Sequence, residues 1–302
     1  MTNNQLKVLE YVSLNKSVNE IIKELNINEI KLIEILNQLK NKGYEIKKEY
    51  YSDGSVILRT NNNYKDSIPT IHTGNDREKF IIKSDTHYGS YAERPDLDDI
   101  VMDYAVKNNY HLMFHLGDFI DGISDSPNIK GRFKTEHGQL KYAIKRCPRD
   151  KSVIQLIIFG NHDCYSLEHY GFNIGTIIEK TGFDLVPIGF ERGRVNIGKD
   201  SIGLFHRIGT KANPDTSISK ITLIGHTHRH TIDIVDDRLK IFVPTISDIK
   251  IYDSFISSGF LTMNVGFNNK REIIDCVVDH MVFDNGNNPI ISSEFQYQFK
   301  KK

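Results

Sequence analysis

Five short apolar segments of this chain are each followed within three residues by Asp, His or Asn side chains. The segments are residues 80–82, 112–116, 153–159, 202–205 and 221–224, and the polar side chains that follow them are Asp85, His87, Asp118, Asn161, His162, Asp163, His206, His226 and His228. Short apolar runs of this kind predict buried strands, and α/β sheets bind ligands beyond the carboxyl ends of their strands. Carboxylate, imidazole and amide groups without thiolates suit divalent ions such as Mn, Fe or Zn, so the pattern predicts a metal site at a sheet edge.

The strand-like segments alternate with helical patterns early in residues 77–302, and strands dominate after residue 181. Apolar residues recur at helical spacing in residues 97–105, 139–145 and 167–180, and further strand-like runs occupy 241–243 and 260–265. Early alternation followed by late strands argues for an α/β fold with sheets between layers of helices. We therefore predict an α/β domain over residues 77–302.

Residues 1–60 follow a different pattern, of three short helices and a hairpin. The local signals are a capping box at Ser17–Glu20, a helix cap at Asn28, a helix stop at Gly43 and an Asp53-Gly54 turn between the strand-like runs 44–51 and 55–60. Three short helices followed by a hairpin resemble a winged helix-turn-helix domain. In that arrangement residues 28–42 would be the recognition helix and the hairpin would be the wing.

Charge leaves the role of this N-terminal unit open. Residues 1–60 hold nine Lys/Arg and eight Asp/Glu, a net charge of +1, whereas DNA-binding domains are usually distinctly basic. One hypothesis is DNA binding, and the alternative is dimerisation or the docking of a protein. Residues 61–76 are polar, contain Pro69 and Gly74 and lack an apolar period, so we expect a flexible linker that tethers the N-terminal unit.

The bulk composition limits the partners and the compartment. The 39 basic and 39 acidic side chains balance, so nucleic-acid binding would need a local basic patch. Three cysteines, an odd number with no C-x-x-C pair, fit a reducing compartment. The N-terminus has no apolar leader segment and no apolar run approaches the ~18 residues of a membrane span. We therefore expect a soluble cytoplasmic protein.

The polar clusters form an ordered set of motifs. These are D-x-H at 85–87, G-D-x-x-D at 117–121, G-N-H-D at 160–163, His206 alone and G-H-x-H at 225–228. The set resembles the calcineurin-like metallophosphoesterases, whose fold is a β-sandwich flanked by helices. The resemblance implies two metal ions, with Asp118 as the shared ligand. Asp85, His87, Asp118 and His228 would bind one ion, and Asp118, Asn161, His206 and His226 the other. One departure is Phe205, which stands where many members have Gly.

The resemblance also implies a mechanism. A hydroxide that bridges the two ions would attack phosphorus, with Mn²⁺ as the first expectation and Fe, Zn or Ni as alternatives. His162 would face the leaving-group oxygen as general acid or electrostatic stabiliser. Asp163 would fix the tautomer of His162 by accepting its other N–H. Asp121 would lie beside the site as a supporting or turn residue.

The motif details separate branches of the family. Asp85-Thr86-His87-Tyr88-Gly89 together with G-N-H-D looks closer to phosphodiesterases and double-strand-break repair nucleases than to Ser/Thr protein phosphatases. Residues 122–149 are rich in Lys and Arg and would form a basic rim beside the metals, or an ordinary solvated helix face. We predict a phosphodiesterase or nuclease that acts on nucleic acid. The alternatives are a small-molecule phosphatase or cyclic-nucleotide phosphodiesterase whose N-terminal unit serves dimerisation or docking, and a DNA-binding regulator. The partners that we expect are nucleic acid and a second copy of the chain in a homodimer, with no membrane.

Overall fold

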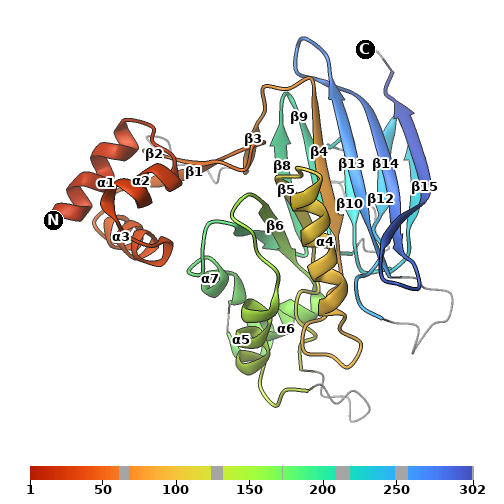
Figure 1. The fold of residues 1–302 in the computed structure, drawn as a ribbon, viewed down its shortest axis with the longest axis horizontal. Coiled ribbons are helices and arrows are strands. Elements are labelled where there is room, and N and C mark those ends of the chain that lie inside the picture. The colour runs from red at the N-terminus through yellow and green to blue at the C-terminus, as the bar shows by residue number, and fades with distance from the viewer. Residues whose placement is uncertain (61–67, 124–131, 172, 208–217, 249–257, 301–302) are drawn as a thin grey trace.

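The computed structural model describes residues 1–60, 68–123, 132–171, 173–207, 218–248 and 258–300. Two mixed β-sheets form the centre of the molecule, with helices against the outer face of one sheet and three N-terminal helices beside the end of the other (Figure 1). This mixed α/β architecture agrees with the predicted fold class. Within the described ranges, no helix combines the length and the apolar character that crossing a membrane would require.

One sheet has seven strands among the described residues, in the order β15-β14-β13-β4-β5-β6-β7. Its parallel half consists of β4 (Arg77–Lys83), β5 (Leu112–Leu116), β6 (Ile154–Phe159) and β7 (Leu185–Phe190). Its antiparallel half consists of β13 (Gly259–Phe267), β14 (Ile273–Phe283) and β15 (Pro289–Gln298). The carboxyl ends of β4, β5 and β6 therefore lie at the same edge.

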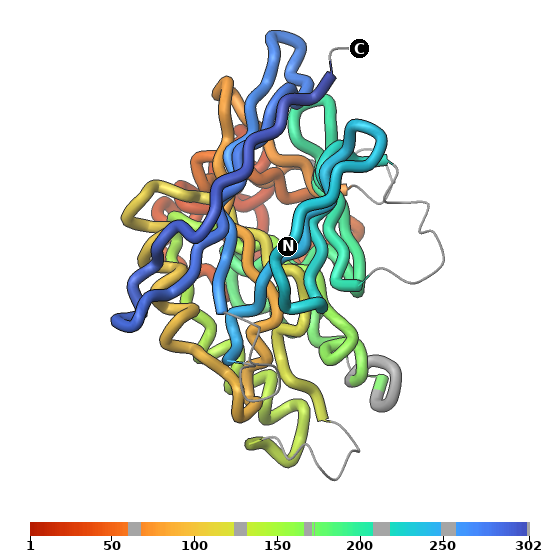
Figure 2. The backbone as a smooth tube through the Cα atoms, turned by 90° about the vertical axis from the view of Figure 1, so that its right-hand side faces the viewer, coloured from red at the N-terminus to blue at the C-terminus, as the bar shows by residue number. Residues whose placement is uncertain are grey.

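The other sheet has eight strands among the described residues, in the order β11-β12-β10-β9-β8-β3-β1-β2. The strands are β11 (Thr231–Val235), β12 (Arg238–Phe242), β10 (Ile221–Ile224), β9 (Asp200–Phe205), β8 (Arg192–Ile197), β3 (Thr70–His72), β1 (Ile46–Tyr51) and β2 (Val56–Thr60). Strands β9 and β10 are parallel, with Ile221 opposite Ile202. In Figure 2 the blue strands of the first sheet and the teal and cyan strands of the second form two neighbouring layers.

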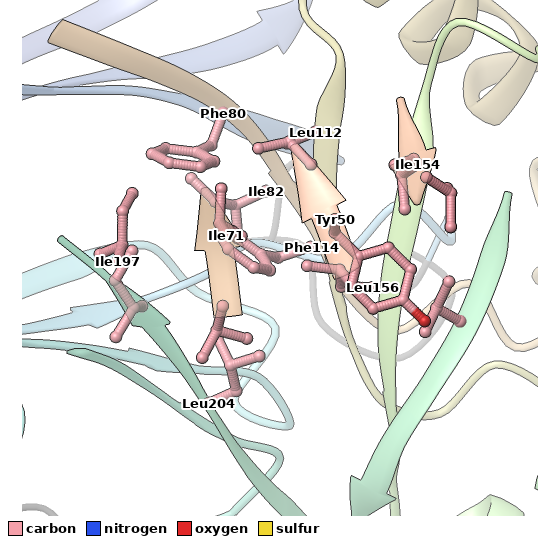
Figure 3. Close-up of a cluster of buried hydrophobic side chains, with 14 of the residues drawn as sticks. Tyr50, Ile71, Phe80, Ile82, Leu112, Phe114, Ile154, Leu156, Ile197 and Leu204 are labelled. Carbon is pink, nitrogen blue, oxygen red and sulfur yellow. The ribbon is translucent and has the colours of Figure 1, made fainter. Parts of the chain in front are cut away.

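The main hydrophobic core lies between the two sheets. Strand alternation sends Phe80 and Ile82 of β4 inward, into the same cluster as Leu204 of β9 (Figure 3). Ile81, which lies between them in the strand, belongs to a separate cluster on the opposite face. That opposite face packs against α4 (Pro95–Lys107) and, further along the sheet, against α5 (Glu136–Arg146) and α7 (Ile174–Ile178). The apolar strands are buried on both faces, which accounts for their nearly continuous apolar runs.

The local predictions for the N-terminal unit are confirmed. It contains α1 (Asn3–Ser13), α2 (Val18–Leu25), α3 (Glu29–Asn41) and the β1–β2 hairpin. The Ser17 side chain accepts from the Glu20 backbone N–H in a capping box, and Asn28 caps α3 through the Lys31 N–H. Gly43 has φ +87°, as a residue that ends a helix often does.

The expectation of a structureless linker over residues 61–76 was wrong in part. Residues 70–72 form β3, which pairs with β1 on one side and with β8 on the other, whereas residues 61–67 lie outside the described ranges. Ile71 is only 1% exposed and belongs to the same core as Val8 and Phe80. A single buried Ile in a polar segment is too weak a signal for sequence analysis. The hairpin thus continues the second sheet instead of hanging from a tether.

The helix expected over residues 167–180 also differs. Two helices occupy this region, α6 (Asn161–Tyr170) and α7 (Ile174–Ile178), and Gly171 between them has φ +64°. Helix α6 begins at Asn161, so the Asn161-His162-Asp163 run forms a first helical turn rather than a loop. Polar side chains are favourable there because free N–H groups at a helix start need acceptors.

Candidate metal centre

The carboxyl ends of five strands from both sheets converge on one site. Strands β4, β5 and β6 of one sheet and β9 and β10 of the other end one or two positions before the clustered side chains. Among the described residues, three groups of potential ligands have donor atoms within 4.8 Å of one another: Asp85, His87 and His228; His87, Asp118 and His162; Asp118, His206 and His226. The structure therefore brings together side chains that lie up to 143 positions apart in the sequence.

Five of these residues have a left-handed backbone. The φ angles are +55° at Asp85, +43° at His87, +49° at Asp118, +65° at His226 and +59° at His228. Residues with a Cβ atom rarely adopt this conformation, and such residues cluster at functional sites when the surrounding structure holds them. Here the Asp85 N–H donates to the Gly117 carbonyl at 3.0 Å and the His87 N–H donates to the Asp118 carbonyl at 2.9 Å.

Asp85 is the centre of the first group. Its carboxylate is fully buried, with Oδ1 3.1 Å from Nε2 of His228 and Oδ2 accepting the His226 backbone N–H at 3.1 Å. Nε2 of His87 lies 3.8 Å from Asp85 Oδ1. Two imidazoles and a carboxylate thus face one small volume at the carboxyl end of β4.

Asp118 is the centre of the second group. Its Oδ2 lies 3.1 Å from Nε2 of His206, and its Oδ1 accepts the backbone N–H of His162 in the first turn of α6 at 3.0 Å. The same Nε2 of His206 lies 3.0 Å from Oδ1 of Asn161. Nδ1 of His206 lies 2.8 Å from the Leu116 carbonyl, which directs Nε2 toward the site.

The approach of these groups requires glycine at two positions. A Cβ atom on Gly117, where φ is +96°, would lie 2.5 Å from Nδ1 of His206. A Cβ atom on Gly160 would lie 2.5 Å from the backbone nitrogen of Asp118. Both contacts are closer than atoms tolerate, so the two glycines allow the strand ends to meet.

The electrostatics of the site favour cations. Burial opposes a charge on His206, but its hydrogen bond to Asp118 and the charge of that carboxylate outweigh burial and raise the pKa of His206 to about 9. Burial likewise disfavours a charged His87, yet the neighbouring Asp121, Asp118 and Asp85 raise its pKa to about 9. Burial alone would raise the pKa of Asp118, but the imidazoles of His206, His87 and His162 lower it by more, so the net shift is a decrease. Two buried carboxylates thus hold positive charge nearby.

The His87 ring gives a direct test of whether these residues fit a metal ion. Both of its nitrogens are buried and make no hydrogen bond among the described residues, although Nδ1 faces Oδ1 of Asp121 at 3.4 Å. Nε2 nevertheless lies between two carboxylates, 3.8 Å from Asp85 Oδ1 and 3.7 Å from Asp118 Oδ2. Since an unpaired buried nitrogen is costly, and a shared cation would satisfy all three atoms, the residues fit a divalent metal.

His162 lies at the open side of the cluster. Its side chain is 38% exposed, and Nε2 is 4.0 Å from Asp118 Oδ2. Nδ1 lies 2.5 Å from the backbone carbonyl of Asp121, so Nδ1 carries the proton that this carbonyl accepts. The remaining nitrogen, Nε2, is left to face the site.

Asp163 does not have the role that we expected. It does not contact the His162 ring; its fully buried carboxylate accepts the backbone N–H groups of Gly160, Phe119 and Ile120 at 2.7, 3.0 and 2.8 Å. The expected tautomer-fixing contact to His162 is made by the Asp121 carbonyl instead. The reason is geometric, because a side chain in the first helical turn points back toward the free N–H groups near it. Asp163 joins the loop after β5 to the loop after β6.

Sequence reasoning missed a supporting chain of hydrogen bonds. The Gly117 N–H donates to Nδ1 of His115 at 3.3 Å, and Nε2 of His115 lies 3.0 Å from the Thr86 hydroxyl, which donates to the Phe119 carbonyl at 3.1 Å. Burial lowers the pKa of His115 well below its usual value, so the ring is neutral. This chain links the loops after β4 and β5. The alternation of β5 was the available signal, because it places His115 on the face opposite Phe114.

Comparison with known proteins matches the part of the chain that contains the candidate metal centre. Residues 78–241, which are 164 of the 302 residues, match the family described as calcineurin-like phosphoesterase. No curated protein matches the chain.

Similar solved structures include three proteins of low sequence identity. A conserved protein of Streptococcus pneumoniae TIGR4, described as a predicted phosphoesterase, is 15% identical with a TM-score of 0.43, over 74% of this chain and 99% of that chain. The phosphoesterase Yfce of E. coli is 16% identical with a TM-score of 0.43, over 72% and 98%. Vacuolar Protein Sorting 29 of Cryptosporidium parvum is 13% identical with a TM-score of 0.43, over 74% and 100%.

Proposed function

Because this chain belongs to the calcineurin-like phosphoesterase family and is a metal-dependent phosphoesterase, we propose that it hydrolyses phosphodiesters at a pair of divalent ions. The single observation that carries the proposal is the position of Asp118. Its Oδ2 atom lies 3.1 Å from His206 of one ligand group and 3.7 Å from His87 of the other. A carboxylate can serve two cations at once, whereas a neutral imidazole cannot.

Each ion has its own set of ligands in this proposal. One would be held by Asp85, His87, Asp118 and His228, and the other by Asp118, Asn161, His206 and His226. When bound, the ions would supply an activated water and the positive charge that stabilises the transition state of phosphoester hydrolysis. Asn161 contributes a neutral oxygen, so the shared site needs only the two carboxylates of Asp85 and Asp118. Mn²⁺ suits this mixture of oxygen and imidazole ligands.

His162 would act on the leaving group. The Asp121 carbonyl holds its Nδ1–H, so a second proton on Nε2 would be directed at the open side of the site. From there it could protonate or stabilise the leaving oxygen. Partial exposure of the side chain leaves room for a substrate. We therefore assign His162 a catalytic role and Asp163 a positioning role.

Nucleic acid is the substrate class that we propose first. Three helices and a hairpin precede the phosphoesterase domain, and Lys134, Lys141 and Lys145 are exposed near the start and along α5. Other basic side chains of residues 122–149 are neutralised, since Arg146 pairs with Asp99 at 2.6 Å and Arg149 with Asp184. Lys130 and Asp125 of that segment lie outside the described residues. Arg132 likewise pairs with Glu93, so among the described residues of this segment the basic surface is formed mainly by the lysines.

The test is a matrix of Mn²⁺, Mg²⁺, Zn²⁺ and Ni²⁺ against single-stranded DNA, duplex DNA, RNA, cyclic dinucleotides, bis-p-nitrophenyl phosphate and p-nitrophenyl phosphate. We expect diesters to be cleaved faster than the monoester, and polynucleotide cleavage to fall steeply with salt. Hydrolysis of the monoester alone would overturn the diesterase proposal. Hydrolysis of small diesters without any polynucleotide cleavage would overturn the choice of nucleic acid.

One observation favours a second candidate, a small-molecule phosphodiesterase whose N-terminal unit docks a protein or a second copy. Leu36, Asn37 and Lys40 of α3 line a cleft of about 380 Å³, whose other wall includes Glu179 and Pro187 of the phosphoesterase domain. Part of α3, which would be the recognition helix, thus faces its own chain. This arrangement restricts how α3 could enter a DNA groove. Sedimentation with and without duplex DNA separates the two candidates.

A further inference from the structure

A buried ion pair lies behind the loop that carries Asp85 and His87. The Lys83 ammonium is 2.6 Å from Oδ1 of Asp98, and the side chains are 0% and 1% exposed. The Tyr88 hydroxyl donates to the other oxygen, Oδ2, at 2.5 Å and is also buried. The Asp98 carboxylate on α4 therefore holds both Lys83, two positions before Asp85, and Tyr88, the residue just after His87.

This arrangement has no obvious purpose in stability alone. Burying two charges carries a large desolvation cost, and well-packed apolar residues of similar volume often serve a core equally well. Lys83 is the last residue of β4, a strand whose preceding residues Phe80, Ile81 and Ile82 are apolar and fully buried. Packing therefore does not explain why a charged Lys83, paired with Asp98, occupies the end of this strand.

The loop between the two anchors has the unusual backbone already described. Asp85 and His87 both have positive φ angles, which side chains disfavour. Only three residues separate the anchored Lys83 from His87, so a small shift at either end would move both imidazole and carboxylate donors. Anchoring both ends to one carboxylate limits such shifts.

Tyr88 also connects this loop to the loop that carries Asp118. Its N–H donates to the Phe119 carbonyl at 2.9 Å, and its own carbonyl accepts the Asp121 N–H at 3.1 Å. The Tyr88 ring packs edge-on against Phe119, with centroids 5.4 Å apart. A displacement of the Tyr88 side chain would therefore shift the backbone at Asp118, the shared ligand, as well as at His87.

We propose that Asp98 is a positioning residue that, through Lys83 and Tyr88, holds the two ligand loops in the geometry that a metal ion requires. The inference rests on the proposed metal site. Groups behind metal ligands typically change metal affinity by roughly 10–100-fold when they are removed, although they do not touch the ion. Lys83, Asp98 and Tyr88 would act in this way without contacting substrate.

The test replaces the three polar side chains by apolar ones of similar volume, Lys83→Met, Asp98→Leu and Tyr88→Phe together. Co²⁺ binding is followed by the visible absorption spectrum, which reports coordination geometry, and folding by thermal denaturation. We expect a folded protein with a Tm near that of the wild type, a Co²⁺ affinity roughly 10–100-fold lower and an altered spectrum. In the metal-free protein, the amides of His87 and Tyr88 should exchange hydrogen faster.

Two further variants keep the test decisive. Tyr88→Phe alone removes one hydroxyl and should lower the Co²⁺ affinity even if the triple variant fails to fold. Asp99→Asn is the matched control, since Asp99 is the next residue of α4 and its carboxylate pairs with Arg146 at 2.6 Å instead of with Lys83 or Tyr88. It should leave Co²⁺ binding unchanged.

The outcomes distinguish this inference from the proposed function. If the wild-type protein binds no Co²⁺, the metal site itself is wrong and the positioning role falls with it. If the wild type binds Co²⁺ and the folded triple variant or Tyr88→Phe binds it equally well, with unchanged amide exchange, only the positioning role is overturned.

Discussion

Nε2 of His87 lies 3.7 Å from Oδ2 of Asp118, although the two residues follow different strands and the nitrogens of the His87 ring make no hydrogen bond among the described residues. The same Asp118 oxygen lies 3.1 Å from His206. The first prediction follows: Asp118→Asn removes the shared charge, so metal content should fall from about two ions to one or fewer, and hydrolysis should fall with it. Elemental analysis and bis-p-nitrophenyl phosphate turnover measure both.

Asp275→Asn is a suitable control for Asp118→Asn, because Asp275 forms a surface ion pair with Arg77. It should retain both metals and the activity. Full activity of EDTA-treated wild-type protein without added metal would contradict the shared-metal site altogether.

The second prediction concerns His162. Because Asp121 holds Nδ1 and Nε2 faces the open side, His162→Ala should keep the bound metals and lose activity by roughly 10²–10⁴-fold. The loss should be smaller on substrates with a good leaving group such as p-nitrophenol, since these need less protonation. An equal loss on good and poor leaving groups would indicate charge stabilisation instead, and loss of metal would make His162 a ligand.

Asp163→Asn tests the corrected role of Asp163. The carboxylate accepts three backbone N–H groups, whereas an amide offers one oxygen and turns an NH₂ group toward at least one of them. We expect a loss of about 1–3 kcal/mol in the free energy of unfolding, together with weaker metal binding. Urea denaturation measures the first and Co²⁺ titration the second. An unchanged stability with a selective loss of activity would return Asp163 to a direct catalytic role.

Deletion of residues 1–60 should destabilise the phosphoesterase domain. It removes β1 and β2, leaves β3 as a sheet edge and exposes Ile71, which is 1% exposed in the intact chain. A flexible tether would instead allow deletion without effect on small substrates. We expect a lower Tm and reduced turnover of bis-p-nitrophenyl phosphate, measured beside the surface control Lys31→Ala. An unchanged Tm and unchanged turnover would support an independent N-terminal unit.

The reactivity of the Cys147 and Cys276 thiols tests whether these side chains are buried in the folded protein. Burial raises the pKa of Cys147 and of Cys276 to about 12, and only the thiolate reacts with disulfide reagents. At pH 8, well below that value, roughly one thiol in 10⁴ would be ionised. In a Cys164→Ala background the native protein should therefore react very slowly with Ellman's reagent at pH 8 and rapidly once unfolded. Rapid reaction of the native protein would show that these thiols are accessible.

Much of the local structure could be read from neighbouring residues. The Ser17–Glu20 capping box, the Asn28 cap and the Asp53-Gly54 turn were predicted because each depends on contacts within a few residues. The apolar runs 112–116 and 221–224 coincide with β5 and β10, because strand burial leaves a continuous apolar signal.

What the sequence by itself determined was therefore the type of many local elements and the polar residues at the strand ends, whereas β3 and the break between α6 and α7 escaped it. The tertiary structure alone decided which groups meet. Asp163 bonds to Phe119 across 44 positions, and β3 joins two strands because Ile71 fits a shared core. Asp98 could reach both Lys83 and Tyr88 only once α4 had packed on β4. Such contacts depend on long-range strand register and helix packing, and neither leaves a periodic pattern in the chain.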